Sequence, residues 1–363
     1  MKVDFLIIGA GFAGATLAER VATQLDKKVL LVDKRNHIGG NCYDYYNTAG
    51  ILIQKYGPHI FHTSSKRVWD YLSQFTEWNG YIHRVLANVC GIEVCFPLNL
   101  YTMQQLYGYQ FTPEEMQQYF ESKKINLREI NNARDVVISQ LGEELYELFF
   151  RNYTKKQWGM DPDELDAQVT KRIPIKYNND TRYFTDKYQG IPKYGYHLLF
   201  ENMLSHKNIH VLLNTDYKDI VKVVQFEQLC YTGPIDYFFD YRYGKLPYRS
   251  LDFQFETLDI ERYQSVAVIN FPNEYDYTRI TEFKHFYFQK HHKTTICYEY
   301  PKAEGEPYYP IPQRVFEEMY CKYKTETEKL KYIYFLGRLA EYAYLNMDQV
   351  VDNALNLFDR IKN

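Results

Sequence analysis

An apolar run at the start of the chain ends in three glycines and is followed at once by a helical pattern. The run and its glycine turn span Val3–Gly14, and the helical pattern spans Ala15–Leu25. A second apolar run, Lys28–Val32, comes next. Continuous apolar runs that alternate with helices are typical of parallel strands buried on both faces. The pattern therefore predicts a strand, a tight turn, a helix and a second strand.

The following part of the chain changes to strand alternation and then to helical spacing. Ser64–Phe75 reads as an amphipathic helix, and Tyr81–Phe96 alternates as two strands around a turn at Gly91. From 102 to 151 the pattern is helical, with Thr112 as an N-cap before a proline and two acids. This region predicts an inserted helical domain. The polar loop after it is a candidate lid over a substrate, and an ordinary surface loop is the alternative.

Strand alternation dominates the C-terminal half. Pro192–Ser205 is helical in pattern, and 210–214 predicts a strand that could join the N-terminal sheet. The segments that alternate like antiparallel strands are Leu251–Leu258, Gln264–Asn270, Thr278–Phe286 and Thr294–Tyr300. A last strand at Tyr332–Arg338 and an amphipathic helix at Met347–Ile361 close the chain.

The composition is that of a soluble globular protein and limits the partners. The 363 residues carry a net charge of −3, so neither nucleic acid nor a membrane surface is an expected partner. Six scattered cysteines without a C-x-x-C pair are typical of reduced thiols, which makes the cytoplasm the expected location. No signal peptide fits the start, and the longest uncharged run, Phe5–Ala18, is too short to span a bilayer. The 37 tyrosines suit sugars and bases, although a biased composition explains many of them.

The glycine turn has the spacing of a dinucleotide site. Gly9 permits the turn, Gly11 lets backbone approach a ligand, and Gly14 lets helix and strand pack closely. The helix start then offers unpaired N–H groups to a pyrophosphate. Asp33 follows Gly14 by nineteen residues and can accept both hydroxyls of an adenosine ribose. The alternative is a glycine turn that only packs.

Two loops after Asp33 carry further candidates. A basic residue and a Gly-Gly-Asn turn at 35–41 are what backbone adopts when it passes close to a cofactor, and a simple loop is the alternative. His59 and His62 follow in the next loop, three residues apart. Further metal ligands at suitable spacing are lacking there, and adjacent His291 and His292 cannot both face one site, so no metal centre is expected.

A Rossmann start, an antiparallel domain and a late strand–glycine–helix that returns to the cofactor form a flavoprotein plan. The fold class is therefore α/β, with a Rossmann-like FAD-binding domain, an inserted helical domain and an antiparallel-sheet substrate domain. The FAD-binding domain is expected from 1–78, 207–232 and 326–363, and the helical domain with its lid loop from 99–165. The substrate domain is expected from 79–98, 166–206 and 233–325.

Several strings spread over the whole chain together resemble the bacterial UDP-galactopyranose mutases. They are G9-A-G-F-A-G, R35-N-H-I-G-G-N, Y56-G-P-H-I-F-H-T, Y153-T-K-K-Q-W-G, K171-R-I-P, Y231-T-G-P-I-D, Y248-R-S-L, Y277-T-R-I-T-E, Y308-Y-P-I and G337-R-L. The resemblance implies FAD that acts when reduced, interconversion of UDP-galactopyranose and UDP-galactofuranose through a flavin N5–galactose adduct, and a role in cell-surface polysaccharide. It also implies a homodimer.

The resemblance assigns residues on both sides of such a site. Arg172 and Arg279 match arginines that meet charge on the pyrophosphate, for which guanidinium forks are well suited. His62 matches a histidine near the flavin face, as a polar contact or, as a weaker alternative, in proton transfer. The other residues assigned to the substrate are His83, Phe149, Phe150, Tyr153, Thr154, Trp158, Tyr183, Arg249, Tyr309 and Tyr344. Those assigned to the flavin are Gly9, Gly11, Phe12, Gly14, Asp33, Lys34, Arg35, Gly40, Asn41, His59, Arg338, Asn346, Met347 and Asp348.

Two positions depart from the family pattern. His83 stands where better-known members carry Asn, and Asn346 stands where they carry Asp. Neither departure removes an indispensable residue, but both leave the sugar specificity open. Two other functions remain as alternatives: a flavin-dependent oxidoreductase of the amine-oxidase-like plan and a non-catalytic UDP-sugar binder.

Overall fold

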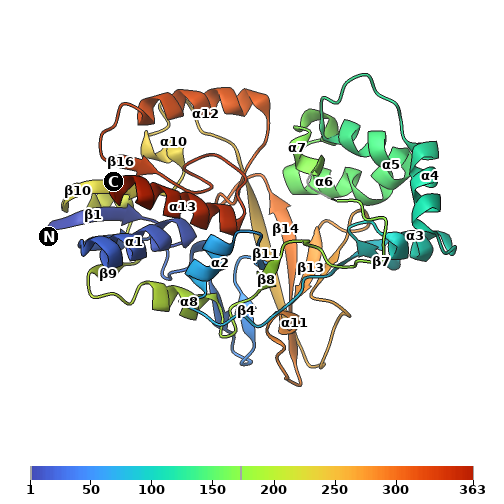
Figure 1. The fold of residues 1–363 in the computed structure, drawn as a ribbon, viewed down its shortest axis with the longest axis horizontal. Helices are drawn as coiled ribbons and strands as arrows, with labels where there is room; N and C mark the ends of the chain where they lie inside the picture. The colour runs from blue at the N-terminus through green and yellow to red at the C-terminus, as the bar shows by residue number, and fades with distance from the viewer. Residues whose placement is uncertain (1, 172–173, 363) are drawn as a thin grey trace.

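The computed structural model describes residues 2–171 and 174–362, so the predicted site residue Arg172 lies outside the described part. A parallel sheet with its helices and a second, larger sheet lie side by side, and a group of helices lies beyond the second sheet (Figure 1). Both ends of the chain are on the side of the parallel sheet.

The parallel sheet has five strands. In spatial order they are β16 (Ile333–Phe335), β10 (Gln225–Tyr231), β1 (Lys2–Ile8), β2 (Val29–Val32) and β9 (Ile209–Leu212). Every pair is parallel, and Ile7 and Leu31 are fully buried in the middle of it. These strands confirm the two predicted at the start of the chain, the one predicted at 210–214 and the last one, predicted at Tyr332–Arg338.

Helices cover the parallel sheet. α1 (Phe12–Leu25) and α13 (Met347–Lys362) pack against each other, which brings the end of the chain back to the first helix (Figure 1). The other elements on this side are η1 (Gly40–Cys42), α2 (Lys66–Leu72), α8 (Tyr196–Met203), α9 (Tyr217–Ile220), α10 (Ile235–Phe238) and α12 (Arg314–Thr327). α8 begins at Tyr196, four residues later than expected, because the amides of Tyr196 and His197 bind the Asp44 carboxylate and set the helix start there.

The second sheet has seven strands. In spatial order they are β15 (Tyr309–Pro310), β11 (Tyr248–Leu258), β14 (Thr294–Lys302), β13 (Arg279–Glu282), β12 (Val268–Asn270), β6 (Val85–Val89) and β7 (Ile92–Phe96). The pairs are antiparallel except β12 with β6, which is parallel. The four segments predicted to form an antiparallel sheet do pair antiparallel with one another. β6 joins them through its parallel pair with β12, which the long connection between β6 and β12 allows and no hairpin could make.

The strand expected at Thr278–Phe286 is shorter. It ends at Glu282, and the short helix α11 (Lys284–Tyr287) follows. The Glu282 carboxylate accepts from the amides of Tyr263 and Gln264, so it anchors a neighbouring loop at the strand end. Two small two-stranded sheets complete the strands: β3 (Asp44–Tyr46) with β4 (Leu52–Gln54), and β5 (Phe61–Thr63) with β8 (Tyr188–Gly190).

The remaining helices gather on the far side of the second sheet (Figure 1). They are α3 (Leu100–Tyr107), α4 (Pro113–Lys123), α5 (Ala133–Phe149), α6 (Arg151–Trp158), η2 (Pro162–Glu164) and α7 (Gln168–Lys171). Thr112 forms the predicted cap of α4, and its hydroxyl accepts from the Glu115 amide. Gly142 breaks α5 with a φ of +79°, and a Cβ there would lie 2.4 Å from the Lys123 carbonyl oxygen. Within the described residues, no helix is long and apolar enough to cross a membrane.

Candidate active site

The turn between β1 and α1 has the shape of a dinucleotide cradle. Gly9 has a φ of +103°, and a Cβ on Gly14 would lie 1.9 Å from the Gly9 carbonyl oxygen, so the turn and close packing predicted for these glycines are confirmed. A Cβ on Gly11 would meet only Gly40 Cα, at 3.6 Å. The N-cap residue of α1 is Gly11, so no N-cap side chain binds the first-turn amides of this helix. These amides and the open space at Gly11 fit the phosphates of a dinucleotide.

Asp33 is tied to this turn. Its carboxylate accepts from the backbone amides of Ala10 at 2.8 Å and Arg35 at 2.9 Å. Each carboxylate oxygen can accept a further hydrogen bond, so contact with a ribose stays a prediction. The Arg35 guanidinium donates to Asn41 Oδ1 at 2.9 Å and to Glu306 at 3.1 Å, and it lies over the Tyr56 ring. Lys34 pairs with the same Glu306 at 3.4 Å.

The end of the chain returns to the cradle as expected. Gly337, which follows β16, has a φ of +92°, and a Cβ there would come within 3.1 Å of Ala13 in α1. The next residue, Arg338, donates to the Leu345 carbonyl at 2.6 and 3.2 Å, which fixes its guanidinium near the start of α13. Asp348 in the first turn of α13 accepts from Thr63 Oγ1 at 2.9 Å.

A cavity of about 460 Å³ opens beside this returning segment. The lining groups come from β5, β6, the α5–α6 junction, β13, β14 and the segment before α13. The predicted site residues that line it are His59, His62, His83, Phe149, Phe150, Tyr153, Thr154, Trp158, Tyr183, Arg279, Tyr309, Arg338, Tyr344, Asn346 and Met347. The structure therefore brings most of the predicted substrate residues together with the C-terminal flavin residues.

Arg279 provides a partly buried positive charge in this cavity. Its guanidinium donates to Tyr153 Oη at 2.9 Å, and its Nε lies 3.6 Å from Glu299. Burial lowers the pKa of Arg279, but Tyr153 and Glu299 outweigh this effect and raise it, so the side chain stays charged. Burial raises the pKa of Glu299 despite the arginine. Arg279 Nε and Glu299 Oε1 have no hydrogen-bond partner among the described residues. The unmet N–H donor of Arg279 suits an anionic ligand.

Aromatic side chains also line the cavity. Trp158, the last residue of α6, is 5% exposed and meets the Tyr309 and Tyr344 rings at 6.4 and 6.1 Å between centroids. Phe149 and Phe150 join α5 to α6 and are buried. These rings offer flat faces to a base or a sugar.

Three histidines line the cavity in different environments. Burial lowers the pKa of His59 to about 4 and that of His83 to about 3, so both are neutral at physiological pH. His59 Nδ1 faces the Gly57 carbonyl at 3.0 Å, and His83 Nδ1 faces Tyr81 Oη at 3.1 Å. His62 instead has a carboxylate partner, Asp186, at 2.7 Å. In the described residues, no group of three or more metal-ligating side chains is present.

Arg249 lies elsewhere than the substrate assignment suggests. Its buried guanidinium donates to the carbonyls of Gln157 at 3.0 Å and Lys156 at 3.2 Å, and burial lowers its pKa. It therefore holds the C-terminal end of α6, which carries Trp158, and does not line the cavity.

Sequence reasoning missed several groups in the cavity wall, and Phe184, Asp186 and Glu299 are among them. Glu299 could have been noticed in the sequence, because it is the one carboxylate in a strand made largely of apolar and hydroxyl-bearing residues, and it is buried there. Phe184 and Asp186 lie in a polar stretch without periodicity, and nothing in the sequence pairs Asp186 with a histidine 124 residues away.

Comparisons with known proteins agree with this geometry. The family model for UDP-galactopyranose mutase matches residues 148–344, and that for an NAD(P)-binding Rossmann-like domain matches residues 7–75. The chain is 39% identical to a probable UDP-galactopyranose mutase of Klebsiella pneumoniae, over 98% of this chain and 94% of the relative. It is 38% identical to a dTDP-fucopyranose mutase of Escherichia coli, over 96% of each.

Among solved structures, a reduced UDP-galactopyranose mutase superposes with a TM-score of 0.82 at 15% identity, covering 100% of this chain and 94% of that one. At this identity the match supports the fold alone. The family model spans more than half of the chain and the relatives match it nearly end to end. By these matches, the chain belongs to the UDP-galactopyranose mutase family.

Proposed function

We propose that this protein interconverts UDP-galactopyranose and UDP-galactofuranose with reduced FAD. The observation that carries the proposal is one cavity lined by Arg279, Trp158 and Arg338, which come from three distant segments of the chain. A partly buried guanidinium, aromatic side chains and a cation on the cofactor side suit a nucleoside diphosphate sugar held against a flavin.

The substrate side is proposed to hold the nucleotide and its diphosphate. Phe149, Phe150, Tyr153 and Thr154 would surround the uracil and ribose. Arg279, and Arg172 by resemblance, would neutralise the diphosphate, with Tyr183, Tyr309 and Tyr344 as further donors. Breaking a glycosyl–phosphate bond places charge on the diphosphate, and fixed cations stabilise that charge in the transition state.

The cofactor side is proposed to hold FAD. Gly9–Gly14 would bind its diphosphate, and Asp33 would bind its ribose. When reduced and bound, FAD supplies N5 as a nucleophile for the anomeric carbon while UDP leaves, so the flavin–galactose adduct belongs to this proposal. Arg338 would place positive charge beside the reduced ring, and Asn346, Met347 and Asp348 would shape the loop next to it.

The wider setting is also a proposal. The product would supply galactofuranose for cell-surface polysaccharide, and the enzyme would act in the cytoplasm as a homodimer. The dTDP-fucopyranose mutase of Escherichia coli is about as similar to this chain as the first relative, which makes dTDP-fucopyranose a second candidate substrate. The two substrates differ in the base, the ribose 2′-hydroxyl and the sugar 6-hydroxyl.

One experiment separates these possibilities. The purified protein is reduced with dithionite and given UDP-galactofuranose or dTDP-fucopyranose, and the products are resolved by chromatography. Turnover of the uridine substrate only in the reduced state is the expected result. Faster turnover of the thymidine substrate would select the second candidate. Flavin reoxidation with loss of substrate would indicate an oxidoreductase, and binding without conversion would indicate a sugar-nucleotide binder.

A further inference from the structure

Both members of the pair His62–Asp186 line the cavity. Nδ1 of His62 and Oδ2 of Asp186 are 2.7 Å apart. The other carboxylate oxygen of Asp186 accepts from Ser64 Oγ at 2.7 Å. Burial raises the pKa of Asp186, but its hydrogen bonds from Ser64 and His62 lower it below the usual value. Asp186 is therefore an ionised acceptor, and His62 Nδ1 must carry the proton between them.

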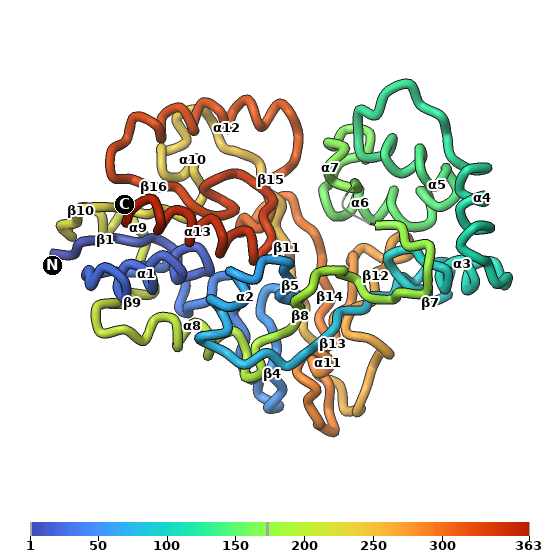
Figure 2. The backbone as a smooth tube through the Cα atoms, viewed as in Figure 1, coloured from blue at the N-terminus to red at the C-terminus, as the bar shows by residue number. Residues whose placement is uncertain are grey.

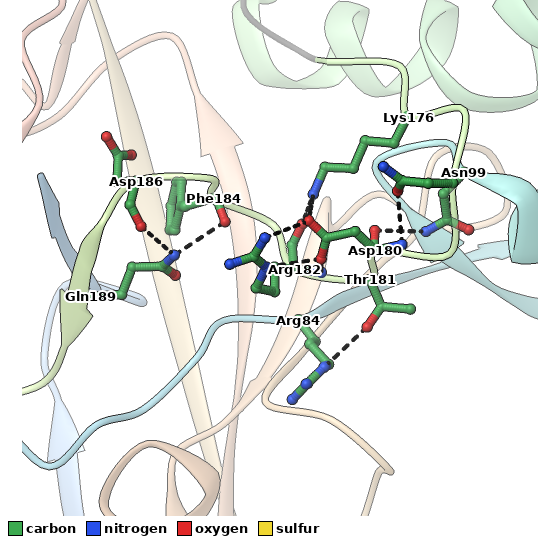
Figure 3. Close-up of polar contacts among 10 residues, drawn as sticks. Arg84, Asn99, Lys176, Asp180, Thr181, Arg182, Phe184, Asp186 and Gln189 are labelled. Atoms are coloured by element: carbon green, nitrogen blue, oxygen red, sulfur yellow. Dashed lines mark hydrogen bonds and ion pairs between the residues drawn. The ribbon is translucent and has the colours of Figure 1, made fainter. Parts of the chain in front are cut away.

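Hydrogen bonds from the Gln189 side chain hold the loop that carries Asp186 in place. Gln189 pairs with His62 in the β5–β8 register, and its side-chain amide donates to the carbonyls of Phe184 at 3.1 Å and Asp186 at 3.0 Å (Figure 3). The loop before β8 is thereby folded over His62. The Phe184 ring stacks on the imidazole at 3.6 Å with an angle of 12° between the planes.

The same loop is anchored at its other end. Lys176 donates to Asp180 and to the Arg182 carbonyl, and Arg182 in turn donates to Asp180 at 2.9 Å (Figure 3). Figure 2 follows the chain from α7 across the molecule to β8 through this loop. Residues Asp186 and Phe184 are thus positioned from both sides by polar contacts that do not involve the cavity.

These contacts leave one polar atom of His62 for the cavity. Phe184 covers a face of the ring, Asp186 occupies Nδ1, and no hydrogen bond to Nε2 is present within residues 2–171 and 174–362. With a single ring proton held on Nδ1 by Asp186, Nε2 is the lone-pair acceptor of the ring. His59 and His83 also line the cavity, but their Nδ1 atoms face a carbonyl and a hydroxyl, not a carboxylate.

The proposed reaction needs such an acceptor. In the pyranose the C5 oxygen closes the ring and the C4 oxygen carries a proton, and in the furanose these roles are exchanged. Conversion therefore breaks the bond from C1 to O5, makes the bond from C1 to O4, and moves one proton from O4 to O5, without net oxidation. A base that takes the proton from one hydroxyl and returns it to the other completes this balance.

We propose that Asp186 and Gln189 are positioning residues that fix the His62 tautomer, so that Nε2 accepts and returns the proton exchanged between the two sugar oxygens. This inference rests on the proposed function. Asp186 acts through His62 and does not itself contact the substrate.

The first test measures the tautomer directly and needs no turnover. The protein is labelled with ¹⁵N-histidine, and the His62 resonances are assigned by their loss in His62→Gln. We expect a protonated Nδ1 and an unprotonated Nε2 in the wild type, and a shift toward the other tautomer in Asp186→Asn. A wild-type His62 with its proton on Nε2 would overturn the proposal, whether or not any variant folds well.

The second test is kinetic. Asp186→Asn keeps the size of the side chain and removes its charge, and we expect kcat to fall roughly 10–100-fold, with KM within about threefold and flavin content unchanged. The control is Glu201→Gln, which removes the carboxylate of an exposed pair with His197 outside the cavity and should leave kcat unchanged.

The outcomes separate the two claims. A wild type that turns over neither sugar nucleotide would reject the proposed function and the proton transfer with it. A wild type that turns over its substrate, with an Asp186→Asn variant of equal kcat, would reject the role of Asp186 and leave the proposed function standing. Equal losses in Asp186→Asn and the control would also reject that role.

Discussion

The glycine turn before α1 and the cavity wall around Arg279 differ in what keeps them in shape. The turn is defined by backbone, because a Cβ on Gly14 would overlap the Gly9 carbonyl at 1.9 Å. The wall is defined by side chains from separate elements, and Arg279 Nε and Glu299 Oε1 within it lack partners in the described part of the chain. Changes of shape should therefore harm the turn most, while changes of charge and donor geometry should harm the wall most.

The strongest test of the wall is Arg279→Ala. Removing the guanidinium takes away the fixed charge proposed to face the diphosphate, and one such group contributes up to roughly 10³-fold in kcat. We expect a loss of this size, with bound flavin retained in the absorption spectrum. Arg279→Lys should recover only part of the rate, because an ammonium lacks the planar fork.

Arg242→Ala is the matched control for the loss of an arginine. Arg242 is exposed and pairs with Glu326 at 3.4 Å, away from the cavity, so turnover should not change. If Arg279→Ala turned over as fast as the wild type, the wall would not be the diphosphate site.

The turn should respond to size instead. Gly14→Ala forces α1 away from β1, and overpacking of this kind costs about 3 kcal/mol, or roughly 100-fold in cofactor affinity. The measurement is the FAD content after dialysis and the affinity of the apoprotein for added FAD. Gly50→Asn is the control, since Gly50 also has a positive φ but nothing lies within 4 Å of its Cβ position. Equal flavin affinity in both variants would contradict the steric argument.

This difference also decides what the sequence could predict. The glycine turn could be predicted because the strand, the glycines and Asp33 lie within one short segment with a fixed spacing. The late return of Gly337 and Arg338 followed from the strand–glycine–helix pattern. The cavity wall was assigned only through resemblance, because Arg279, Tyr153 and Glu299 belong to elements whose neighbours cannot be derived from local pattern.

The misses have physical reasons of the same kind. Helix α12 was not predicted, and Tyr323 is the only one of its described residues that is buried. The parallel contact of β12 with β6 depends on how distant segments pack, and alternation along a strand does not reveal the direction of its neighbour. Asp186 escaped because its role comes from a contact across 124 positions.

A smaller effect is expected where α6 meets the second sheet. The Lys156 ammonium donates to the carbonyls of Phe271 at 2.5 Å, Tyr275 at 2.7 Å and Tyr277 at 3.1 Å. It thus joins the helix that carries Trp158 to the loop that precedes Arg279. Lys156→Met should lower kcat/KM by roughly 30-fold, or about 2 kcal/mol, as expected for the loss of a charged donor to several carbonyls.

The neighbouring lysine supplies the control for this prediction. Lys155 pairs with Asp161 on the surface at 3.0 Å, so Lys155→Met removes the same charge without touching the loop. Steady-state kinetics of the two variants should differ clearly. Similar kinetics would mean that net charge, not the link between α6 and the loop, sets the rate.

The smallest predicted effect concerns the buried neutral histidine of the wall. Burial lowers the pKa of His83 to about 3, so below pH 6.5 the unfolded chain binds a proton there that the folded protein does not. Folding stability must then fall as pH falls through this window, by up to about 1.4 kcal/mol per pH unit. Between pH 7 and pH 5.5 the wild type should lose about 1 kcal/mol more than His83→Asn, which cannot titrate.

Denaturant unfolding of both proteins at the two pH values measures this difference. The exposed His210→Asn serves as the control and should lose stability in parallel with the wild type. By the family resemblance, which implies Asn at this position, His83→Asn should still fold and bind flavin. If the free energy of unfolding changed with pH equally in the wild type and His83→Asn, the folded protein would accept a proton at His83. The contrast between a turn defined by shape and a wall defined by charge would then not apply to this residue.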